Sequence, residues 1–219
     1  MSSDQLPRYP QKYSGFLLKR IHVADLSHIY GPGHRGIIAD EAIKKGDLIL
    51  ENDPTTSMFH PFDSKRGIQT VEEWCHLFDQ QSDLDVKEFL TRYSIPYDDK
   101  HVSVPRNYLK RDTVDYSVLL NHSCNANCTS TYTDRVIAIK DIDPGNVLTL
   151  DYGIGITDDM WPFPFTVCKC REPSCAGADV FKRYQQTDWQ EKFYDYCFPC
   201  VKSKIDEIRK RKILNNAVF

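Results

Sequence analysis

Short apolar runs separated by turn residues mark two parts of the chain. Residues 33–51 contain the runs GIIA and LILE, joined by the turn KKGD, in which Gly46 supplies the bend. Residues 134–152 repeat the arrangement, with RVIAI, then an Asp-Pro-Gly turn, then VLTLDY. Short apolar strands on either side of a turn commonly pair with each other, so we predict a β-hairpin in each part.

Between these two parts the periodicity becomes helical. Thr70 and Glu73 fit a capping box at the start of a helix. The apolar residues after it recur at helical spacing: Trp74, Leu77 and Phe78, then Val86, Phe89, Leu90 and Tyr93. We therefore predict a helical insert between strands, over about residues 61–93.

The last part of the chain is also helical in pattern. Two apolar helix faces follow one another: Trp189, Phe193 and Tyr196 before Pro199, and Val201, Ile205 and Ile208 after it. We expect this tail to fold against the rest of the protein. It carries the basic run RKRK at 209–212, which is either a solvated last helical turn that complements the helix dipole or a nuclear import signal.

Composition is typical of a globular protein. The 219 residues suffice for one domain with appendages, and 41% of them are hydrophobic. The net charge of −3 argues against a general nucleic-acid coat protein, and no apolar run approaches the roughly 20 residues that cross a bilayer. The first residues lack the apolar core of a signal peptide. We expect a soluble intracellular protein with no membrane or direct nucleic-acid partner.

Eight cysteines suggest metal ligation or free buried thiols, because no export signal supports a disulfide framework. Three of them lie in CKCREPSC, residues 168–175, and three thiolates make an incomplete tetrahedral zinc site. Cys197 and Cys200 form a separate C-x-x-C, which predicts either buried thiols or a second zinc site. Cys75 and Cys128 are expected to pack in the core or at its edge.

The segment NHSCNANC, residues 121–128, sets a cysteine among small polar residues. Cys124 with His122 could in principle form a nucleophile and its base. The side chains of residues i and i+2 diverge in most backbones, however, so this pairing is not expected. A thiol or redox enzyme would also require reactive, exposed thiolates.

Four segments occur in the order GHRGIIADEAIKKGDLILE, NHSCNANC, GNVLTLDYG and CKCREPSCAG. From about residue 25 to residue 180, they give the chain a resemblance to the SET-domain lysine methyltransferases. The resemblance implies a mostly β fold with strands around a pseudoknot, a helical insert, a zinc-binding post-SET segment and C-terminal helices. The implied organisation is an N-terminal extension over 1–24, a SET domain over 25–153, a linker and post-SET segment over 154–180, and a helical tail over 181–219.

The resemblance also implies the missing zinc ligand, because the family's Asn-His-Ser-Cys segment contributes one cysteine. The ligand set then becomes Cys124, Cys168, Cys170 and Cys175. Four thiolates leave no open position for water, so this zinc would be structural and would hold the post-SET segment against the core.

The family binds S-adenosylmethionine against the glycine-motif loop and the Asn-His pair. The implied contacts are His34, Arg35 and Gly36 at the methionine end, Asn121 and His122 at the amino group and adenine, and Lys169 over the adenine. Glycine suits a position where the backbone approaches a ligand closely. Tyr93 is a further candidate, unless it is only the last apolar position of its helix face.

Tyr152 of LDYG is the implied catalytic residue. In the family this tyrosine hydroxyl lies near the methyl group and the lysine amine, and it orients the attack. The amine must be neutral to attack, and a narrow, poorly hydrated channel favours the neutral form. The rate enhancement then comes mainly from alignment and desolvation.

Two positions depart from the family pattern inside the expected lysine channel. Asn52 stands where many members have a tyrosine, and the candidate substitutes for that ring are Tyr97, Tyr108 and Tyr116. Leu150 stands where members have Phe or Tyr. Because leucine is smaller than either ring, it predicts a roomier channel and a di- or trimethyllysine product.

The resemblance thus implies methylation of a lysine in a protein substrate. Histone tails are the family's commonest substrate class, so we also expect a chromatin complex as a partner. The basic run at 209–212 favours the nucleus, with the cytoplasm as the alternative. A non-catalytic SET fold that acts as a scaffold or peptide-binding subunit stays open because of Asn52 and Leu150, whereas Tyr152, Asn121 and His122 favour catalysis.

Overall fold

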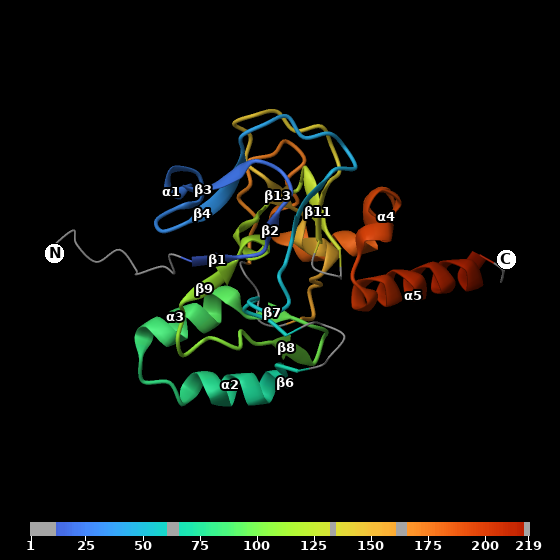
Figure 1. The fold of residues 1–219 in the computed structure, drawn as a ribbon. Helices are drawn as coiled ribbons and strands as arrows, with labels where there is room; N and C mark the ends of the chain where they lie inside the picture. Colours follow the sequence, from blue (N-terminus) through green and yellow to red (C-terminus); the bar gives the residue numbers. More distant parts are fainter. Residues whose placement is uncertain (1–11, 61–65, 132–134, 161–165, 217–219) are drawn as a thin grey trace.

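The computed structural model of the protein describes residues 12–60, 66–131, 135–160 and 166–216, which form several small sheets and two groups of helices (Figure 1). The largest sheet has six strands in the order β10-β13-β11-β12-β5-β2. These strands are β2 (Phe16–Leu17), β5 (Leu48–Glu51), β10 (Asn121–His122), β11 (Cys128–Ser130), β12 (Arg135–Ala138) and β13 (Thr149–Leu150). The fold is mostly β, as the sequence predicted.

Both hairpin predictions are wrong, although each apolar run contributes to a strand. β4 (Arg35–Ala39) pairs with β3 (Ile21–Asp25) in a sheet of its own, while β5 joins the six-stranded sheet. β12 and β13 are separated by β11. The residues that precede the two predicted turns pair instead, since Ile43 bridges Ile142. Each turn contacts the end of a strand: the Gly46 amide donates to the Ala138 carbonyl at the end of β12, and the Gly145 amide donates to the Ala39 carbonyl at the end of β4, each over 2.8 Å. An apolar run shows that a strand is buried but does not name its partner.

The helical insert forms as predicted, although residues 61–65 lie outside the described residues. It comprises β6 (Ile68–Thr70), α2 (Val71–Asp79), α3 (Leu84–Tyr93), β7 (Ile95–Pro96) and β8 (His101–Ser103). The capping box is confirmed: the Glu73 amide donates to Thr70 Oγ1 over 3.1 Å, and the Thr70 amide donates to Glu73 Oε2 over 2.7 Å. A paired cap of this kind satisfies two backbone donors at the start of α2.

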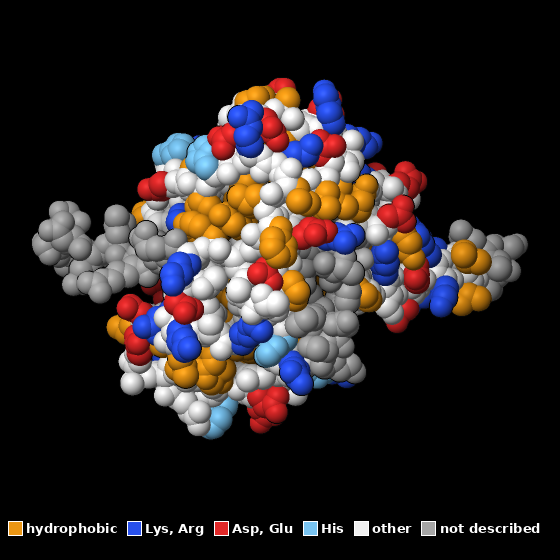
Figure 2. Space-filling model, in the orientation of Figure 1, with side chains coloured by type: hydrophobic (Ala, Val, Ile, Leu, Met, Phe, Trp, Pro, Cys, Tyr) orange, Lys and Arg blue, Asp and Glu red, His pale blue; other side chains and the backbone are white. Residues whose placement is uncertain are grey.

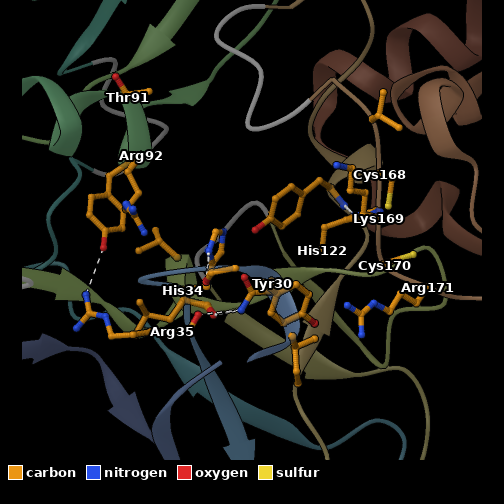
Figure 3. Close-up of a pocket in the computed structure, with 18 of the residues that line it drawn as sticks. Tyr30, His34, Arg35, Thr91, Arg92, His122, Cys168, Lys169, Cys170 and Arg171 are labelled. Carbon is orange, nitrogen blue, oxygen red and sulfur yellow. Dashed lines mark hydrogen bonds between the residues drawn. The ribbon is translucent and has the colours of Figure 1, made fainter. Parts of the chain in front are cut away.

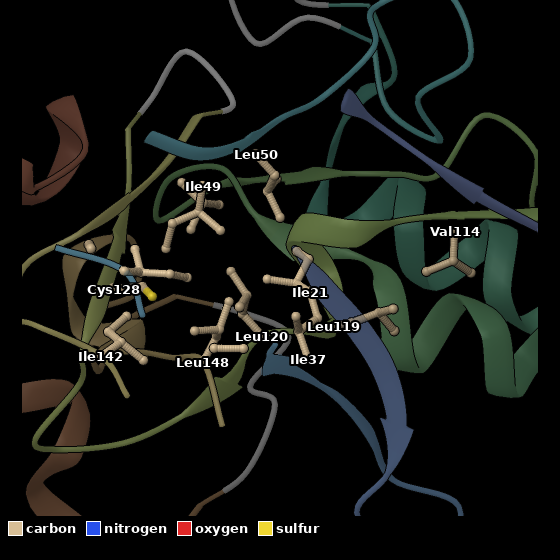
Figure 4. Packing of buried hydrophobic residues seen from close by; sticks show 14 of the residues in the cluster. Ile21, Ile37, Ile49, Leu50, Val114, Leu119, Leu120, Cys128, Ile142 and Leu148 are labelled. Carbon is tan, nitrogen blue, oxygen red and sulfur yellow. The ribbon is translucent and has the colours of Figure 1, made fainter. Parts of the chain in front are cut away.

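The α3 helix connects the insert to the main core. Its residues Val86 and Leu90 pack with Trp74 in a small core of the insert, whereas Phe89 and Tyr93 pack against the main core. The main core itself joins the sheets and includes the following buried residues (Figure 4): Ile21, Ile37, Ile49, Leu50, Val114, Leu119, Leu120, Cys128, Ile142 and Leu148. Two further elements, β1 (Lys12–Ser14) and β9 (Thr113–Asp115), pair in parallel beside it.

The four cysteines outside the predicted zinc set fall into three environments. Cys128 is buried in the main core, as expected. Cys75 is exposed on α2, so the expectation that it packs in the core or at its edge is wrong. The side chain of Trp74 is buried, and that of Cys75 points about 100° away from it around the helix axis. Cys197 is buried and its thiol donates to the Phe193 carbonyl over 3.3 Å, while Cys200 is half-buried.

The C-terminal tail folds against the sheet region, as predicted. Its elements are η4 (Gly177–Gln185), α4 (Thr187–Phe193), η5 (Tyr194–Tyr196) and α5 (Pro199–Asn216). Trp189, Phe193, Val201 and Ile205 are buried in a core that includes Ile154. Pro199 is the first residue of α5, where its missing N–H costs nothing.

Acidic and basic side chains are interspersed on the visible face of the molecule, and apolar side chains gather around β2 (Figure 2). Exposed apolar residues there are Phe16, Leu17 and Leu18. Among the helices of the described residues, none combines the length and apolar character that a membrane span requires.

Candidate functional site

Two cavities meet between α3, β10 and the cysteine-rich segment. The larger has a volume of about 1040 Å³ and the smaller of about 190 Å³. The residues that line both are Thr91, Arg92, Tyr93, Val118 and Tyr152. Because the two cavities share these lining residues, a molecule in one cavity can contact a molecule in the other at this junction.

The glycine-rich loop between α1 (Ser27–Tyr30) and β4 forms one side of the larger cavity. Gly33 adopts a φ of 73°, which favours glycine, and the next residues, His34 and Arg35, line the cavity. The Arg35 guanidinium donates to the hydroxyls of Tyr13 (2.8 Å) and Tyr93 (3.4 Å). These two bonds hold the arginine head group in place beside α3.

Gly36 does not line the cavity but permits its wall to form. A Cβ at this position would lie 2.3 Å from Leu26 and 2.7 Å from Asn121 Nδ2. With glycine there, Asn121 Nδ2 donates to the Arg35 carbonyl over 2.9 Å. The bond leaves the Asn121 carbonyl oxygen as the end of the side chain that can accept a hydrogen bond from a ligand in the cavity.

Positive charge surrounds the larger cavity. Figure 3 shows Arg35 and His34 on one side, Thr91 and Arg92 on a second, and Lys169, Cys170 and Arg171 opposite them. The charged lining residues are Arg35, Arg92, Lys169 and Arg171, against the single carboxylate of Glu88. A ligand with an anionic end fits such a lining.

The cysteines predicted to bind zinc lie together beside this cavity. The sulfur atoms of Cys124 and Cys168 are 3.8 Å apart, and the backbone amide of Cys124 donates to the sulfur of Cys170 over 3.5 Å. A tetrahedral zinc with Zn–S bonds of about 2.3 Å places its sulfur atoms about 3.8 Å apart. Cys175 is adjacent: a hydrogen bond from the Gly177 backbone lowers the pKa of its thiol, which also interacts with the three other thiols. The spacing of Cys124 and Cys168 fits zinc–thiolate geometry, and Cys175 lies next to them, with its thiol donating to the Cys168 carbonyl over 3.5 Å.

His122 also lies within this cluster, since its ligand atom and those of Cys124, Cys168 and Cys170 are all within 4.8 Å of one another. The Tyr152 amide donates to His122 Nδ1 over 3.1 Å, and burial lowers the pKa of His122 to about 4. The ring is therefore neutral with its proton on Nε2, which lies 3.3 Å from the Cys124 sulfur. A protonated nitrogen cannot ligate a metal, so the four-cysteine set is the better donor set, with His122 donating to one of its sulfur atoms.

The expectation that the side chains of His122 and Cys124 diverge is wrong, because they are in hydrogen-bond contact. The contact does not make a nucleophile and base, however, because Nε2 carries the proton. Burial also raises the pKa of the Cys124 thiol to about 11. A reactive thiolate is thus not supported at this position.

Tyr152 begins the short helix η3 (Tyr152–Ile154), one residue after the end of β13, at the junction of the two cavities. Its hydroxyl donates to the Leu120 carbonyl over 2.9 Å, and its ring meets the His122 ring edge-on at 5.3 Å. Burial raises the pKa of Tyr152, so the hydroxyl is a proton-bearing group and not a base at neutral pH.

Comparison with protein families assigns the chain. Residues 34–153, more than half of it, match the family model described as SET domain. The chain belongs to the SET-domain family. No curated protein matches the chain as a relative. SET domains are usually lysine methyltransferases that use S-adenosylmethionine, which agrees with two cavities that meet at Tyr152.

The smaller cavity of this SET domain contains both positions that depart from the family pattern, Asn52 and Leu150. Of the three tyrosines considered as substitutes, none lines it. Its aromatic residues are Phe59, Tyr93, Tyr152 and Phe198. Phe198 comes from the C-terminal tail, where its amide donates to the Ile154 carbonyl over 2.8 Å. The tail therefore helps to build the SET-domain site, and no motif in the sequence indicated this.

A buried ion pair connects the tail to the LDYG motif of the SET domain. The Asp151 carboxylate is fully enclosed and accepts from Arg183 Nη1 over 2.7 Å and from Trp189 Nε1 over 2.9 Å. Arg183 Nη1 also donates to the Cys124 carbonyl over 3.3 Å. One arginine thus joins the residue before Tyr152 to the cysteine cluster.

Replacement of Arg183 by methionine is expected to lower the free energy of unfolding by about 3 to 5 kcal/mol, because it leaves a buried carboxylate without its charged partner. Denaturant unfolding of the whole protein measures this. Lys182→Met is the matched control, since Lys182 pairs with Asp179 on the surface and its loss should change little. Equal effects of the two variants would contradict the role assigned to the buried pair.

Several site residues were not found from the sequence. Tyr30 and Arg92 line the larger cavity but belong to no motif, and Arg171 lines it from within CKCREPSC, where only the cysteines and Lys169 were singled out. Asp151 precedes Tyr152 and Arg92 precedes Tyr93, and both tyrosines were named from the sequence. Adjacency to these tyrosines was the sequence signal that could have found Asp151 and Arg92. Arg183 carried no signal, because its partners are distant in the chain.

Proposed function

We propose that this SET domain transfers methyl groups from S-adenosylmethionine to a lysine side chain of a protein substrate. The observation that carries the proposal is the meeting of a large, positively lined cavity with a narrow, mostly apolar one at Tyr152. The first has the size and charge for a methyl donor with a carboxylate end, and the second has the width and lining for an alkyl amine.

The residues that line the larger cavity fit the donor. Arg35 and Lys169 offer cationic partners to its carboxylate, and the Asn121 carbonyl oxygen can accept from its amino group. His34, His122 and Tyr93 complete the surrounding wall. Gly36 acts indirectly, by making room for Asn121.

Cys124, Cys168, Cys170 and Cys175 would hold a structural zinc, for which the 3.8 Å sulfur–sulfur spacing is the supporting observation. The metal would supply no step of the reaction. It would hold the segment that carries Lys169 and Arg171 over the larger cavity.

Bound S-adenosylmethionine supplies an electrophilic methyl group. Phe59, Leu150 and Phe198 exclude water from the smaller cavity, so the neutral form of an entering lysine amine is favoured over its ammonium form. Tyr152 limits the positions that the amine can adopt where the cavities join, and its hydroxyl is already oriented by the Leu120 carbonyl. Catalysis then rests on alignment and desolvation.

The finer parts of the proposal concern substrate and location. We propose a histone tail as the substrate, di- or trimethyllysine as the product, and nuclear action in a chromatin complex. The exposed Lys210, Arg211 and Lys212 support the location, since an import signal must be accessible. The roomier channel that Leu150 allows supports the higher methylation states.

Two measurements test the proposal. Calorimetry should show binding of S-adenosylmethionine to the purified protein, and mass spectrometry of a peptide array incubated with both should show added methyl groups on lysine. Cofactor binding without transfer to any peptide would favour the scaffold alternative. Absence of cofactor binding by the folded protein would refute the assignment of the larger cavity.

A further inference from the structure

Two tyrosines hold the Arg35 head group, and only one of them lines a cavity. The guanidinium donates to the Tyr13 hydroxyl over 2.8 Å and to the Tyr93 hydroxyl over 3.4 Å, and a dashed line marks the second bond in Figure 3. Arg35 and Tyr93 line the larger cavity, whereas Tyr13 lines neither of the two cavities. The shorter of the two bonds therefore comes from a residue outside the lining.

Tyr13 also lies outside the part of the chain that matches the SET-domain family, residues 34–153. It is the middle residue of β1, and the parallel pairing with β9 places it opposite Val114. Its ring packs on the ring of Tyr116 with 5.2 Å between the centroids, and the Arg35 guanidinium lies over it, 5.6 Å from the centroid. Strand pairing and ring packing thus fix the position of the Tyr13 hydroxyl without any ligand.

The bonds of Arg35 to the two tyrosines orient its charge without compensating it. Arg92, in the same cavity wall, forms an ion pair with Glu88 over 3.0 Å, so a carboxylate already compensates that arginine. A hydroxyl accepts a hydrogen bond from a guanidinium but brings no negative charge. A guanidinium has five N–H donors in a planar fork, so it can bond both tyrosines and bind a carboxylate as well. The Arg35 head group is therefore suited to an anionic ligand group.

We infer that Tyr13 is a positioning residue that aims Arg35 at the carboxylate of S-adenosylmethionine, so that strand β1 is part of the cofactor site. The inference rests on the proposed function, which assigns the larger cavity to this cofactor. An arginine that becomes ordered only when its ligand binds loses rotamer freedom, which lowers the affinity by about three- to tenfold. An arginine that Tyr13 already holds avoids most of this loss.

The experiment compares two ligands that differ in one group. Decarboxylated S-adenosylmethionine keeps the sulfonium, the amino group and the adenosine of the cofactor but lacks its carboxylate. Tyr13→Phe removes only the hydroxyl and keeps the packing of the ring on Tyr116 and under the guanidinium. Calorimetry, with competition for the weaker ligand, should show S-adenosylmethionine binding about three- to tenfold weaker in this variant. Binding of the decarboxylated form should be unchanged, an outcome that a general loss of structure would not give.

Two further variants test whether Tyr13 acts through Arg35. Arg35→Met removes the guanidinium and should weaken S-adenosylmethionine binding more than Tyr13→Phe does. Adding Tyr13→Phe to Arg35→Met should then have little further effect, because residues that act as one unit are not additive. Tyr116→Phe is the matched control, since it removes a hydroxyl from the adjacent ring, which also lines neither cavity. It should leave the affinity for both ligands unchanged.

The outcomes separate the inference from the proposed function. If the folded wild-type protein does not bind S-adenosylmethionine, the proposed function fails. If the wild-type protein binds it and Tyr13→Phe binds it equally well, or loses the same factor for both ligands, the proposed function stands and the role of Tyr13 is overturned. Full additivity of Tyr13→Phe and Arg35→Met would also overturn it, because Tyr13 would then act without Arg35.

Discussion

Removal of the proposed zinc from the cysteine cluster is expected to abolish binding of S-adenosylmethionine and to release the segment around residues 166–176. Six lining residues of the larger cavity lie in this segment: Val167, Cys168, Lys169, Cys170, Arg171 and Cys175. Without zinc, four clustered thiols no longer hold the segment in place, and the cavity loses a wall. Even loss of a supporting group around a metal commonly costs about 10- to 100-fold in affinity, so loss of the site should cost the cofactor at least as much.

The measurements are metal analysis of natively purified protein, calorimetry of cofactor binding, and limited proteolysis. One zinc per chain is expected. Cys170→Ser should lower the zinc content, weaken cofactor binding and expose the segment to protease. Cys75→Ser is the matched control, because Cys75 is exposed on α2 and distant from the cluster in sequence. Protein without zinc that binds the cofactor normally would refute the structural role of the metal.

Replacement of Tyr152 by phenylalanine is expected to reduce turnover by a factor on the order of 100 or more, the usual effect of losing one oriented hydroxyl or amide at a reacting centre. The ring remains, so its edge contact with His122 and the shape of the junction are kept. Cofactor affinity should therefore stay nearly unchanged. The Leu120 carbonyl loses its donor, which should cost about 1 kcal/mol of stability.

Single-turnover kinetics with a peptide substrate, together with calorimetry, separates these effects. Tyr108→Phe removes a hydroxyl from a half-buried tyrosine that lines neither cavity, and it should leave both turnover and binding unchanged. Unchanged turnover in Tyr152→Phe would remove this residue from the mechanism. A matched loss of turnover and cofactor affinity would instead indicate a role in building the cavity.

Local features of this protein followed from local physics. The capping box at Thr70, the inward faces of α3 and α4, and the start of α5 at Pro199 were predictable, because helical periodicity and capping depend on residues within a few positions of one another. The strands were located for a similar reason. Their partners were not, because a strand can pair with any of several distant segments. Ile43 and Ile142, which precede the two predicted turns, bridge each other, although neither predicted hairpin forms.

The candidate site shows the same division. The order of four motifs in the sequence was enough to indicate the family and to name Tyr152, Asn121 and the four cysteines. The tertiary structure alone decided which nitrogen of His122 carries the proton, since the Tyr152 amide determines it. It alone brought Arg183 and Phe198 of the tail to the site, and enclosed the Asn52 oxygen without a partner. Contacts between segments that are far apart in the chain leave no periodic or spacing signal in the sequence. Periodicity and capping depend only on residues within a few positions, so they carry no information about which distant segment a residue will contact.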